Sequence, residues 1–189
     1  MYMSHGSILK PGVLICLLGG LYYRLKFILY ASKEVLTANR RVCIIDAGSF
    51  LDRRLLSSVF PRSEEQLLHR LIILRPRAYT ETVAAIYLCK RRLSSGDLMA
   101  CIGVSKTYQQ LIAQNLSDRL LPLRFLSAVC APLWDAAHRQ NLIAMIEVES
   151  VRLEGGGLKP IGGDVIPYWA DVIAEVAADN VVKVIKSPA

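Results

Sequence analysis

The sequence predicts an α/β domain built on a doubly wound, mostly parallel central sheet that is flanked by helices. Short runs rich in Val, Ile and Leu, apolar on both faces, alternate along the chain with longer amphipathic segments. Successive strands in such a chain lie parallel, because each connecting helix crosses over with the same hand. The strands are expected at residues 12–18, 41–46, 71–75, 98–104 and 141–148.

Four segments between and around these strands have the apolar spacing of amphipathic helices. Pro61 limits the second, and the run Ser94-Ser95-Gly96 ends the third. Pro122 and Pro132 are expected to start or bend pieces of the fourth. The helices are predicted at residues 24–37, 49–59, 80–93 and 116–140.

The C-terminal part has a different pattern, with β-prone runs at residues 164–179 and 180–189 separated by an Asp-Asn turn. Such a pair predicts an antiparallel hairpin that extends the edge of the sheet. No repeat, low-complexity tract or linker interrupts the chain. We therefore expect one domain over residues 1–189, with residues 1–11 as an N-terminal tail.

The composition of the chain bears on three questions: whether it spans a membrane, whether it holds a metal and whether it binds an acidic partner. Hydrophobic residues make up 53% of the 189 residues, but no uninterrupted apolar run reaches the ~18 residues of a membrane span, so we expect a soluble cytoplasmic protein. The five cysteines are scattered and the three histidines lie far apart, which favours buried free thiols and gives no support for a metal site. The net charge of +7 permits binding to nucleic acid or to an acidic partner, but a solvated basic surface explains it equally well.

The stretch GGLYYRLKF, residues 19–27, directly follows the first apolar run. A strand, a glycine turn and then a Lys is the order of a phosphate-binding P-loop, G-x-x-x-x-G-K-[ST]. Counting from Gly20 places Lys26 in the lysine position, but the second glycine position holds Leu25 and the Ser/Thr position holds Phe27. Taken alone, the stretch is either a P-loop that has lost its function or a helix start that contains an exposed Lys.

Four later segments extend this comparison: RVCIIDAGSFLDRRLL, LRPRAYTETVAAI, LPLRFLSAVCAPLWDAAHRQNLIAMI and LKPIGGDVIPYWADVIAEV. Together with the glycine turn, and in the same order, they resemble the core of the RecA/RadA recombinase ATPases, particularly the archaeal and eukaryotic RadA-like branch. The sharpest match is the family's Lys-Pro-x-Gly-Gly segment, at residues 159–163. The resemblance spans roughly residues 12–187. It implies a RecA-like core with Asp46 at the carboxyl end of a strand that neighbours, or lies close to, the P-loop strand.

The sequence departs from this family at the positions that carry its chemistry. Leu25 puts a side chain where the backbone has to approach phosphate, and Phe27 offers no oxygen to Mg²⁺. The Walker B aspartate is replaced by Val104, or by Gly103 under a one-residue shift. Three further positions differ: the catalytic glutamate is missing near Asp46-Ala47-Gly48, the sensor pair falls at Val148-Glu149, and a histidine is matched by Tyr168.

These departures predict a chain without ATPase activity and without a bound cofactor. Gly20, Lys26 and Asp46 are then the vestige of a nucleotide site. The resemblance and the departures together predict a non-catalytic RadA paralogue that acts as an accessory protein in homologous recombination or DNA repair. The alternatives are an atypical small ATPase of the same fold and an interaction scaffold unrelated to DNA.

The expected partner is a recombinase or another RadA-like paralogue, or a second copy of the chain. Residues 1–11 contain neither the family's N-terminal helical domain nor its Phe-x-x-Ala polymerisation motif, so a filament of its own is not expected. If nucleotide is no longer bound between subunits, the P-loop face can serve as a protein contact. The candidate partner surface is Leu21, Tyr22, Leu25 and Phe27, unless these side chains turn inward and fill the vacated pocket.

Two segments correspond to the family's DNA-facing loops, and here they are residues 106–119 and 152–159. The candidate contacts to single-stranded DNA are Lys106 and Arg119 in the first segment and Arg152 and Lys159 in the second. An ordinary flexible hairpin explains the glycine-rich second segment equally well.

Overall fold

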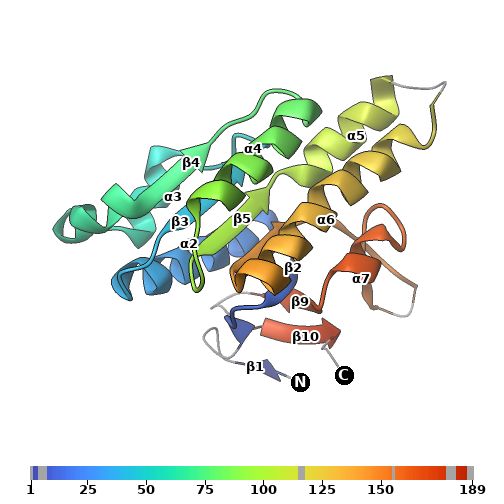
Figure 1. Ribbon diagram of the computed structural model, residues 1–189. Helices are drawn as coiled ribbons and strands as arrows, with labels where there is room; N and C mark the ends of the chain where they lie inside the picture. Colours follow the sequence, from blue (N-terminus) through green and yellow to red (C-terminus); the bar gives the residue numbers. More distant parts are fainter. Residues whose placement is uncertain (1, 4–7, 115–117, 155, 178–181, 187–189) are drawn as a thin grey trace.

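The computed structural model describes the chain except for residues 1, 4–7, 115–117, 155, 178–181 and 187–189. Its centre is an eight-stranded sheet in the order β1-β10-β9-β2-β6-β5-β3-β4 (Figure 1). The six strands from β9 to β4 are parallel, whereas β10 runs antiparallel to β9. The strands are β1 Tyr2–Met3, β2 Val13–Gly19, β3 Val42–Asp46, β4 Leu71–Leu74, β5 Leu98–Ile102, β6 Ile143–Glu147, β9 Val172–Val176 and β10 Val182–Lys186, and a separate hairpin pairs β7 Ser150–Arg152 with β8 Leu158–Pro160.

Two groups of helices cover the two faces of the sheet. α2, α3 and the 3₁₀ helix η1 pack over one face, while α4, α5, α6 and α7 pack over the other, with α6 in contact with the other three. The helices are α2 Leu21–Thr37, α3 Arg53–Val59, η1 Arg62–Arg70, α4 Tyr79–Arg92, α5 Val104–Gln114, α6 Leu121–Gln140 and α7 Val165–Trp169.

Strand β2 shows why the apolar runs predict a sheet that is covered on both sides. Leu14, Cys16 and Leu18 belong to the core that α6 covers, and Ile15 and Leu17 belong to the core that α2 covers. All five side chains are fully buried. A strand buried on both faces needs an unbroken apolar run, and such runs are typical of parallel sheets. The predicted α/β class with a mostly parallel sheet is confirmed.

The C-terminal extension is present, but its first strand, β9, runs parallel to the rest of the sheet, and of the described strands only β10 runs in the opposite direction. β9 pairs with β2 in parallel, and β10 then adds to β9 in the antiparallel direction. The turn at residues 178–181 lies outside the described residues. The prediction of one β-run over residues 164–179 was wrong at its start, because α7 precedes β9 and packs Ile166 and Trp169 beneath α6. The predicted tail also contributes to the sheet, since β1 pairs with β10.

Several helix boundaries differ from the predicted ones. α2 begins at Leu21, three residues before the predicted start, and α3 begins only at Arg53. Residues 104–114 form α5 instead of a strand end and a DNA-facing loop. Val104, Thr107 and Leu111 are buried in this helix, so packing against the core decides its conformation. α6 starts at Leu121, and residues 115–117, at the start of the predicted fourth helix, lie outside the described part.

Cysteine pairing also differs in part from the prediction. Cys16, Cys101 and Cys130 are buried free thiols, as predicted, but Cys43 and Cys89 form a disulfide that joins β3 to α4. Among the helices that the structure describes, none is both long enough and apolar enough to cross a membrane.

Candidate functional site

The candidate site lies at the edge of the sheet where the parallel strands end. β2 ends at Gly19, β3 at Asp46 and β6 at Glu147, and Gly103 directly follows β5. In open α/β sheets this carboxyl edge is where ligands bind. Asp46 is separated from the strand of the glycine turn by β5 and β6, so it lies neither on the immediate neighbour of β2 nor close to it, but three strand spacings away, roughly 14 Å.

The connection from β2 to α2 is the single residue Gly20. The backbone amides of Tyr23 and Arg24 already donate to the Gly20 carbonyl at 3.1 Å, so the first helical turn closes directly after the strand. Gly19 has φ of +110°, and a Cβ there would lie 2.4 Å from the Val176 carbonyl oxygen of β9. Residues that would wrap around phosphate in a P-loop are therefore part of a regular helix.

Lys26 is the sixth residue of α2 rather than a residue at its start. Its ammonium lies 5.0 Å from the centroid of the Tyr22 ring, one turn earlier. A hydrogen bond with the Tyr22 side chain raises the pKa of Lys26. Gly20 and Lys26 are thus separated by more than one turn of helix and do not form one cradle.

A buried ion pair occupies the space next to this turn. Arg24 is 3% exposed and its Nη2 lies 2.9 Å from Oε1 of Glu147, which is 1% exposed. The Gly103 amide donates to Oε2 of the same carboxylate at 2.8 Å, and Arg24 Nη1 donates to the Val148 carbonyl. The ion pair therefore ties the start of α2 to the ends of β5 and β6.

Burial and these contacts act on the pKa of Glu147 in opposite directions. Loss of solvent raises the pKa and is the largest effect, whereas the Arg24 guanidinium and the Gly103 amide lower it. The carboxyls of Glu149 and Asp46 add a smaller increase. The pKa of Glu147 is therefore above its ordinary value, and the Arg24 guanidinium limits the increase.

Asp46 is fully buried, and its carboxylate organises the loop that follows β3. Oδ1 accepts from the amide of Phe50 and Oδ2 from the amide of Leu51, both at 2.9 Å. Arg75 approaches Oδ2 to 3.8 Å from β4's end. Such charge-assisted bonds to backbone amides fix a loop strongly. They also leave this carboxylate directed at the protein's own backbone.

The loop after Asp46 lies directly on the end of β5. Gly103 has φ of +76°, and a Cβ there would lie only 2.1 Å from the amide nitrogen of Gly48. Lys106 Nζ donates to the Gly48 carbonyl at 3.1 Å, so its side chain points along this loop. A carboxylate at position 103 could not fit without moving the backbone. Among the described residues, no group of His, Cys, Asp or Glu side chains is arranged to hold a metal ion.

Comparison with known proteins identifies the architecture. No protein-family model matches the sequence, and no curated protein matches it. Among solved structures, the chain is similar to the crystal structure of the RadB recombinase, with a TM-score of 0.72 and 18% sequence identity. The match covers 95% of this chain and 83% of that one. The chain has the RecA/RadA recombinase fold. The RecA-like core expected from the sequence is thereby confirmed, and function has to be argued from the site.

Within this recombinase fold, the four candidate DNA contacts do not form one cluster. Lys106 is in the first turn of α5, whereas Arg119 follows residues 115–117 beyond its other end. Arg152 is exposed on β7 of the small hairpin, and Lys159 on β8 pairs with Asp164 at 3.1 Å. Of the four, Lys106, Arg119 and Arg152 are exposed with no ion pair among the described residues, although Lys106 is engaged with the Gly48 carbonyl.

The candidate partner surface divides into two halves. Leu21 and Tyr22 are 38% and 54% exposed, but Leu25 is 4% exposed and Phe27 is fully buried. The prediction of an exposed patch is therefore wrong for Leu25 and Phe27, because the helical register turns them into the core beneath α2. A groove beside the exposed half is lined by Leu21, Tyr22, Leu25, Phe50, Asp52, Arg54, Leu55 and Ser58.

Sequence reasoning missed Arg24 and Glu147. The available signal was the spacing of Arg24 to Ile28, Ala31 and Val35, which places it on the buried face of α2. A cation on such a face needs an acidic partner. Glu147 is the first charged residue of an otherwise apolar strand, but the sequence alone does not show that the two side chains meet.

Replacing Gly103 with Ala tests the close approach of the two loops. Gly103→Ala is expected to lower the free energy of unfolding well beyond the ~1–2 kcal/mol that a left-handed backbone costs a non-glycine residue. The control is Gly163→Ala, because Gly163 has φ of +68° and no atom within 4 Å of the added Cβ. Urea denaturation measures both. Equal losses would show that the contact with Gly48 is not restrictive.

Replacing Arg24 with Met tests the buried ion pair. Arg24→Met is expected to cost about 3–5 kcal/mol near neutral pH, because it leaves the Glu147 carboxylate buried without its cation. The double variant Arg24→Met/Glu147→Met is expected to recover most of this loss. Urea denaturation of the two single variants and the double variant gives the coupling energy.

The cost of Arg24→Met should also depend on pH. Glu147 has a raised pKa in the folded chain, so its contribution to stability is present below the ordinary Glu pKa and decreases as pH rises through the raised value. Without Arg24 the pKa rises further and this decrease becomes larger. The destabilisation by Arg24→Met should therefore be smaller near pH 5 than near pH 7.5. A loss independent of pH would contradict the role of Glu147.

Proposed function

We propose that this chain is a non-catalytic accessory protein of homologous recombination or DNA repair, which uses a recombinase fold to contact protein partners. The observation that carries the proposal is the ion pair between Arg24 and Glu147 at the carboxyl edge. In this fold class the carboxyl edge is the place for a ligand, and here these two buried charged groups are engaged with each other.

Phosphoryl transfer needs a backbone cradle and a Lys for the phosphates, a hydroxyl and a carboxylate for Mg²⁺, and a group that positions water. The β2–α2 connection is one residue long, and Phe27 in the hydroxyl position is buried. Asp46 is bound to two amides of its own loop, and Gly103 leaves no room for a side chain. These observations support a chain that neither binds ATP tightly nor hydrolyses it, and they disfavour the atypical ATPase.

The exposed half of the candidate partner surface supports binding to a protein. Leu21, Tyr22 and Tyr23 are consecutive and all exposed in the first turn of α2, and a contiguous exposed apolar patch often marks a protein contact. The groove beside them is largely apolar, with Arg54 at its border. Aromatic and Arg side chains around a groove are typical of interface cores. A recombinase, a RadA-like paralogue or a second copy of the chain is the proposed occupant.

Binding to single-stranded DNA through Arg119 and Arg152 is a weaker part of the proposal, since these two cations are not brought together. An interaction scaffold unrelated to DNA is the second candidate, and it is favoured by the same exposed apolar turn. The two differ in whether the partner is a recombinase.

Addition of Mg-ATP is expected to leave the unfolding temperature unchanged. A ligand at about 100 times its Kd would add roughly 2.7 kcal/mol of stability, which differential scanning fluorimetry detects readily. The variant Lys26→Ala is the control, and it should behave like the parent chain with and without nucleotide. An upward shift that Lys26→Ala abolishes would overturn the proposal and favour the small ATPase.

The double variant Leu21→Ser/Tyr22→Ser tests the partner surface. It is expected to weaken association with a purified recombinase from the same organism at least tenfold, because it removes apolar area from the centre of the contact. Analytical ultracentrifugation of the chain alone and of the mixture measures both self-association and the complex.

The matched control is Tyr87→Ser/Leu88→Ser, since these two residues are exposed to a similar extent on α4. It should leave association unchanged. A chain that stays monomeric and binds no recombinase would leave the scaffold unrelated to DNA as the better account.

A further inference from the structure

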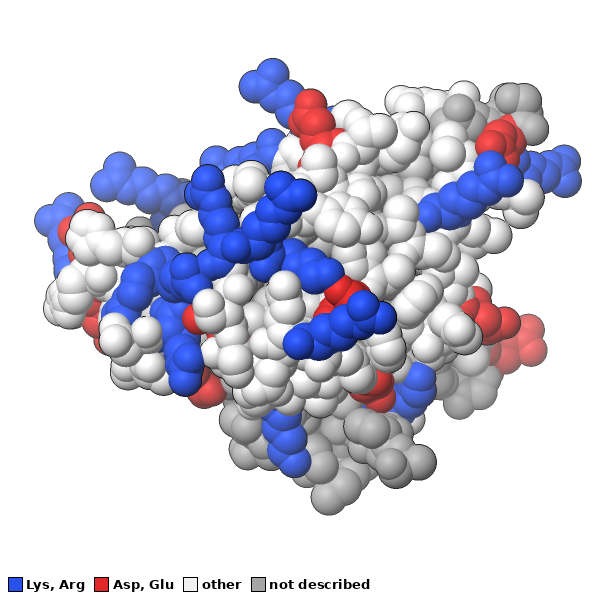
Figure 2. Space-filling model, viewed as in Figure 1, with Lys and Arg blue, Asp and Glu red and all other residues white. Residues whose placement is uncertain are grey.

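Cations gather at the edge of the sheet opposite to the candidate site, where the parallel strands begin. Arg40 and Arg41 directly precede β3, Arg70 precedes β4, and helices α4 and α6 both end at this edge. Figure 2 shows Lys and Arg side chains gathered over the end of α4 and the adjoining loops, with few acidic side chains between them. We call this surface the basic edge; it consists of Arg40, Arg41, Arg70, Lys90, Arg91, Arg92 and Arg139.

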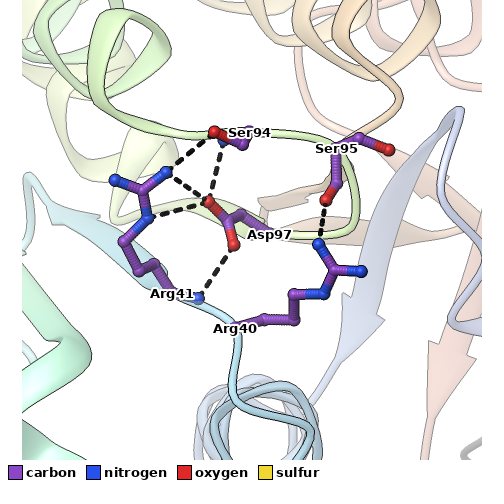
Figure 3. A network of polar contacts seen from close by, with 5 residues as sticks. All are labelled: Arg40, Arg41, Ser94, Ser95 and Asp97. Carbon is purple, nitrogen blue, oxygen red and sulfur yellow. Dashed lines mark hydrogen bonds and ion pairs between the residues drawn. The ribbon is translucent and has the colours of Figure 1, made fainter.

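Two of these cations are held in place by the loop that precedes β5 (Figure 3). Asp97 is 3% exposed, and its carboxylate accepts from the backbone amides of Arg41 at 2.9 Å and Ser94 at 2.8 Å. The Arg41 guanidinium lies 3.1 Å from the same carboxylate and also donates to the Ser94 hydroxyl. Arg40 donates to the Ser95 carbonyl at 2.7 Å. The two guanidinium groups are thus oriented by the fold.

The end of α6 is tied into the same network. Asn141 donates through its side chain to the Ser95 hydroxyl at 2.9 Å, and its carbonyl accepts from the Gly96 amide at 2.9 Å. On α6, Asp135 binds both Lys90 of α4 and Arg139, the latter at 2.9 Å. The basic edge therefore rests on three connected loops and two helix ends.

The charge of the basic edge is only partly neutralised. Asp97 faces Arg41, and Asp135 faces Lys90 and Arg139. Arg91 and Arg92 are exposed, and neither has an ion pair or a side-chain hydrogen bond among the described residues. Attraction to the C-terminal end of a helix dipole accounts for cations in the last turn of α4. It does not account for Arg40 and Arg41, which follow α2 in a loop.

We propose that the basic edge binds the phosphodiester backbone of double-stranded DNA. Guanidinium groups match phosphate with paired donors, and groups held at fixed positions suit the regular phosphate spacing of a duplex. Single strands are instead bound largely by stacking of bases on aromatic rings. The segments at residues 38–41, 93–97 and 139–141 contain no aromatic residue.

This surface is distinct from the candidate contacts Lys106 and Arg152, which lie toward the carboxyl edge. This proposal therefore does not rest on the proposed function, and a result that contradicts one of them does not contradict the other. Tyr87 and Leu88 are exposed one turn before Arg91 and Arg92. Apolar side chains beside cations also suit an anionic membrane surface, and the experiment includes that outcome.

The test is fluorescence anisotropy with a labelled duplex of about 30 base pairs, roughly three helical turns, of arbitrary sequence. Binding is measured from about 50 to about 200 mM salt, beside a single strand of the same length. The parent chain is expected to prefer the duplex and to lose affinity steeply as salt rises. In Arg91→Ala/Arg92→Ala, affinity at low salt should fall about tenfold or more, and the slope of log K against log salt should decrease by about 2.

The matched control is Arg53→Ala/Arg77→Ala, which removes the same charge from exposed positions at the carboxyl edge. It should keep the parent's affinity within about twofold. Equal losses in both variants would show attraction to net charge alone and would overturn the proposal. Preference for the single strand would overturn it too, as would tighter binding to phosphatidylserine vesicles that requires Arg91 and Arg92.

Arg91→Glu/Arg92→Glu provides a second measurement, in which binding should be lost almost completely. Thermal unfolding checks each variant, and little change is expected because both side chains are exposed. If a double variant fails to fold, Arg92→Ala alone should reduce the salt slope by about 1. An unchanged slope in a folded Arg92→Ala variant would then overturn the proposal.

Discussion

The buried ion pair between Arg24 and Glu147 is the interaction on which the carboxyl edge of the sheet depends. Two buried charges are tolerated when they pair with each other and with neighbouring polar groups, so Arg24 has to reach the end of β6. It does so because α2 begins one residue after β2 ends. A longer loop around a phosphate would move Arg24 away from Glu147. The same helical register turns Leu25 and Phe27 into the core and leaves Leu21 and Tyr22 at the surface.

The neighbouring contacts link the ion pair to the loop that follows β3. Glu147 binds the Gly103 amide, Gly103 lies against Gly48, and the loop containing Gly48 is fixed by the Asp46 carboxylate. Opening the edge for a ligand would leave two buried carboxylates without partners, which costs several kcal/mol. These contacts therefore favour the arrangement of the edge that the structure shows.

The fold could be predicted from the sequence more completely than the site. Runs such as residues 12–18 are apolar on both faces, and this local property predicts a buried parallel strand without knowledge of its neighbours. α5 was missed because Val104 continues the apolar strand pattern, and only packing against the core makes it helical. The ion pair was missed because it joins residues far apart in the sequence. Leu25 and Phe27 were misplaced because their exposure depends on where α2 begins.

If the carboxyl edge takes no nucleotide, as proposed, recognition falls to the outer surfaces of the fold. The buried charges of the carboxyl edge are paired, whereas the chain carries a net charge of +7, and the basic edge holds unpaired Arg91 and Arg92. Strands of about five residues separate the two edges by roughly 16 Å. The proposed partner surface at the start of α2 and the proposed DNA surface at the end of α4 therefore lie on opposite sides of one rigid sheet. Where both proposals hold, a protein and a duplex contact the chain through different surfaces.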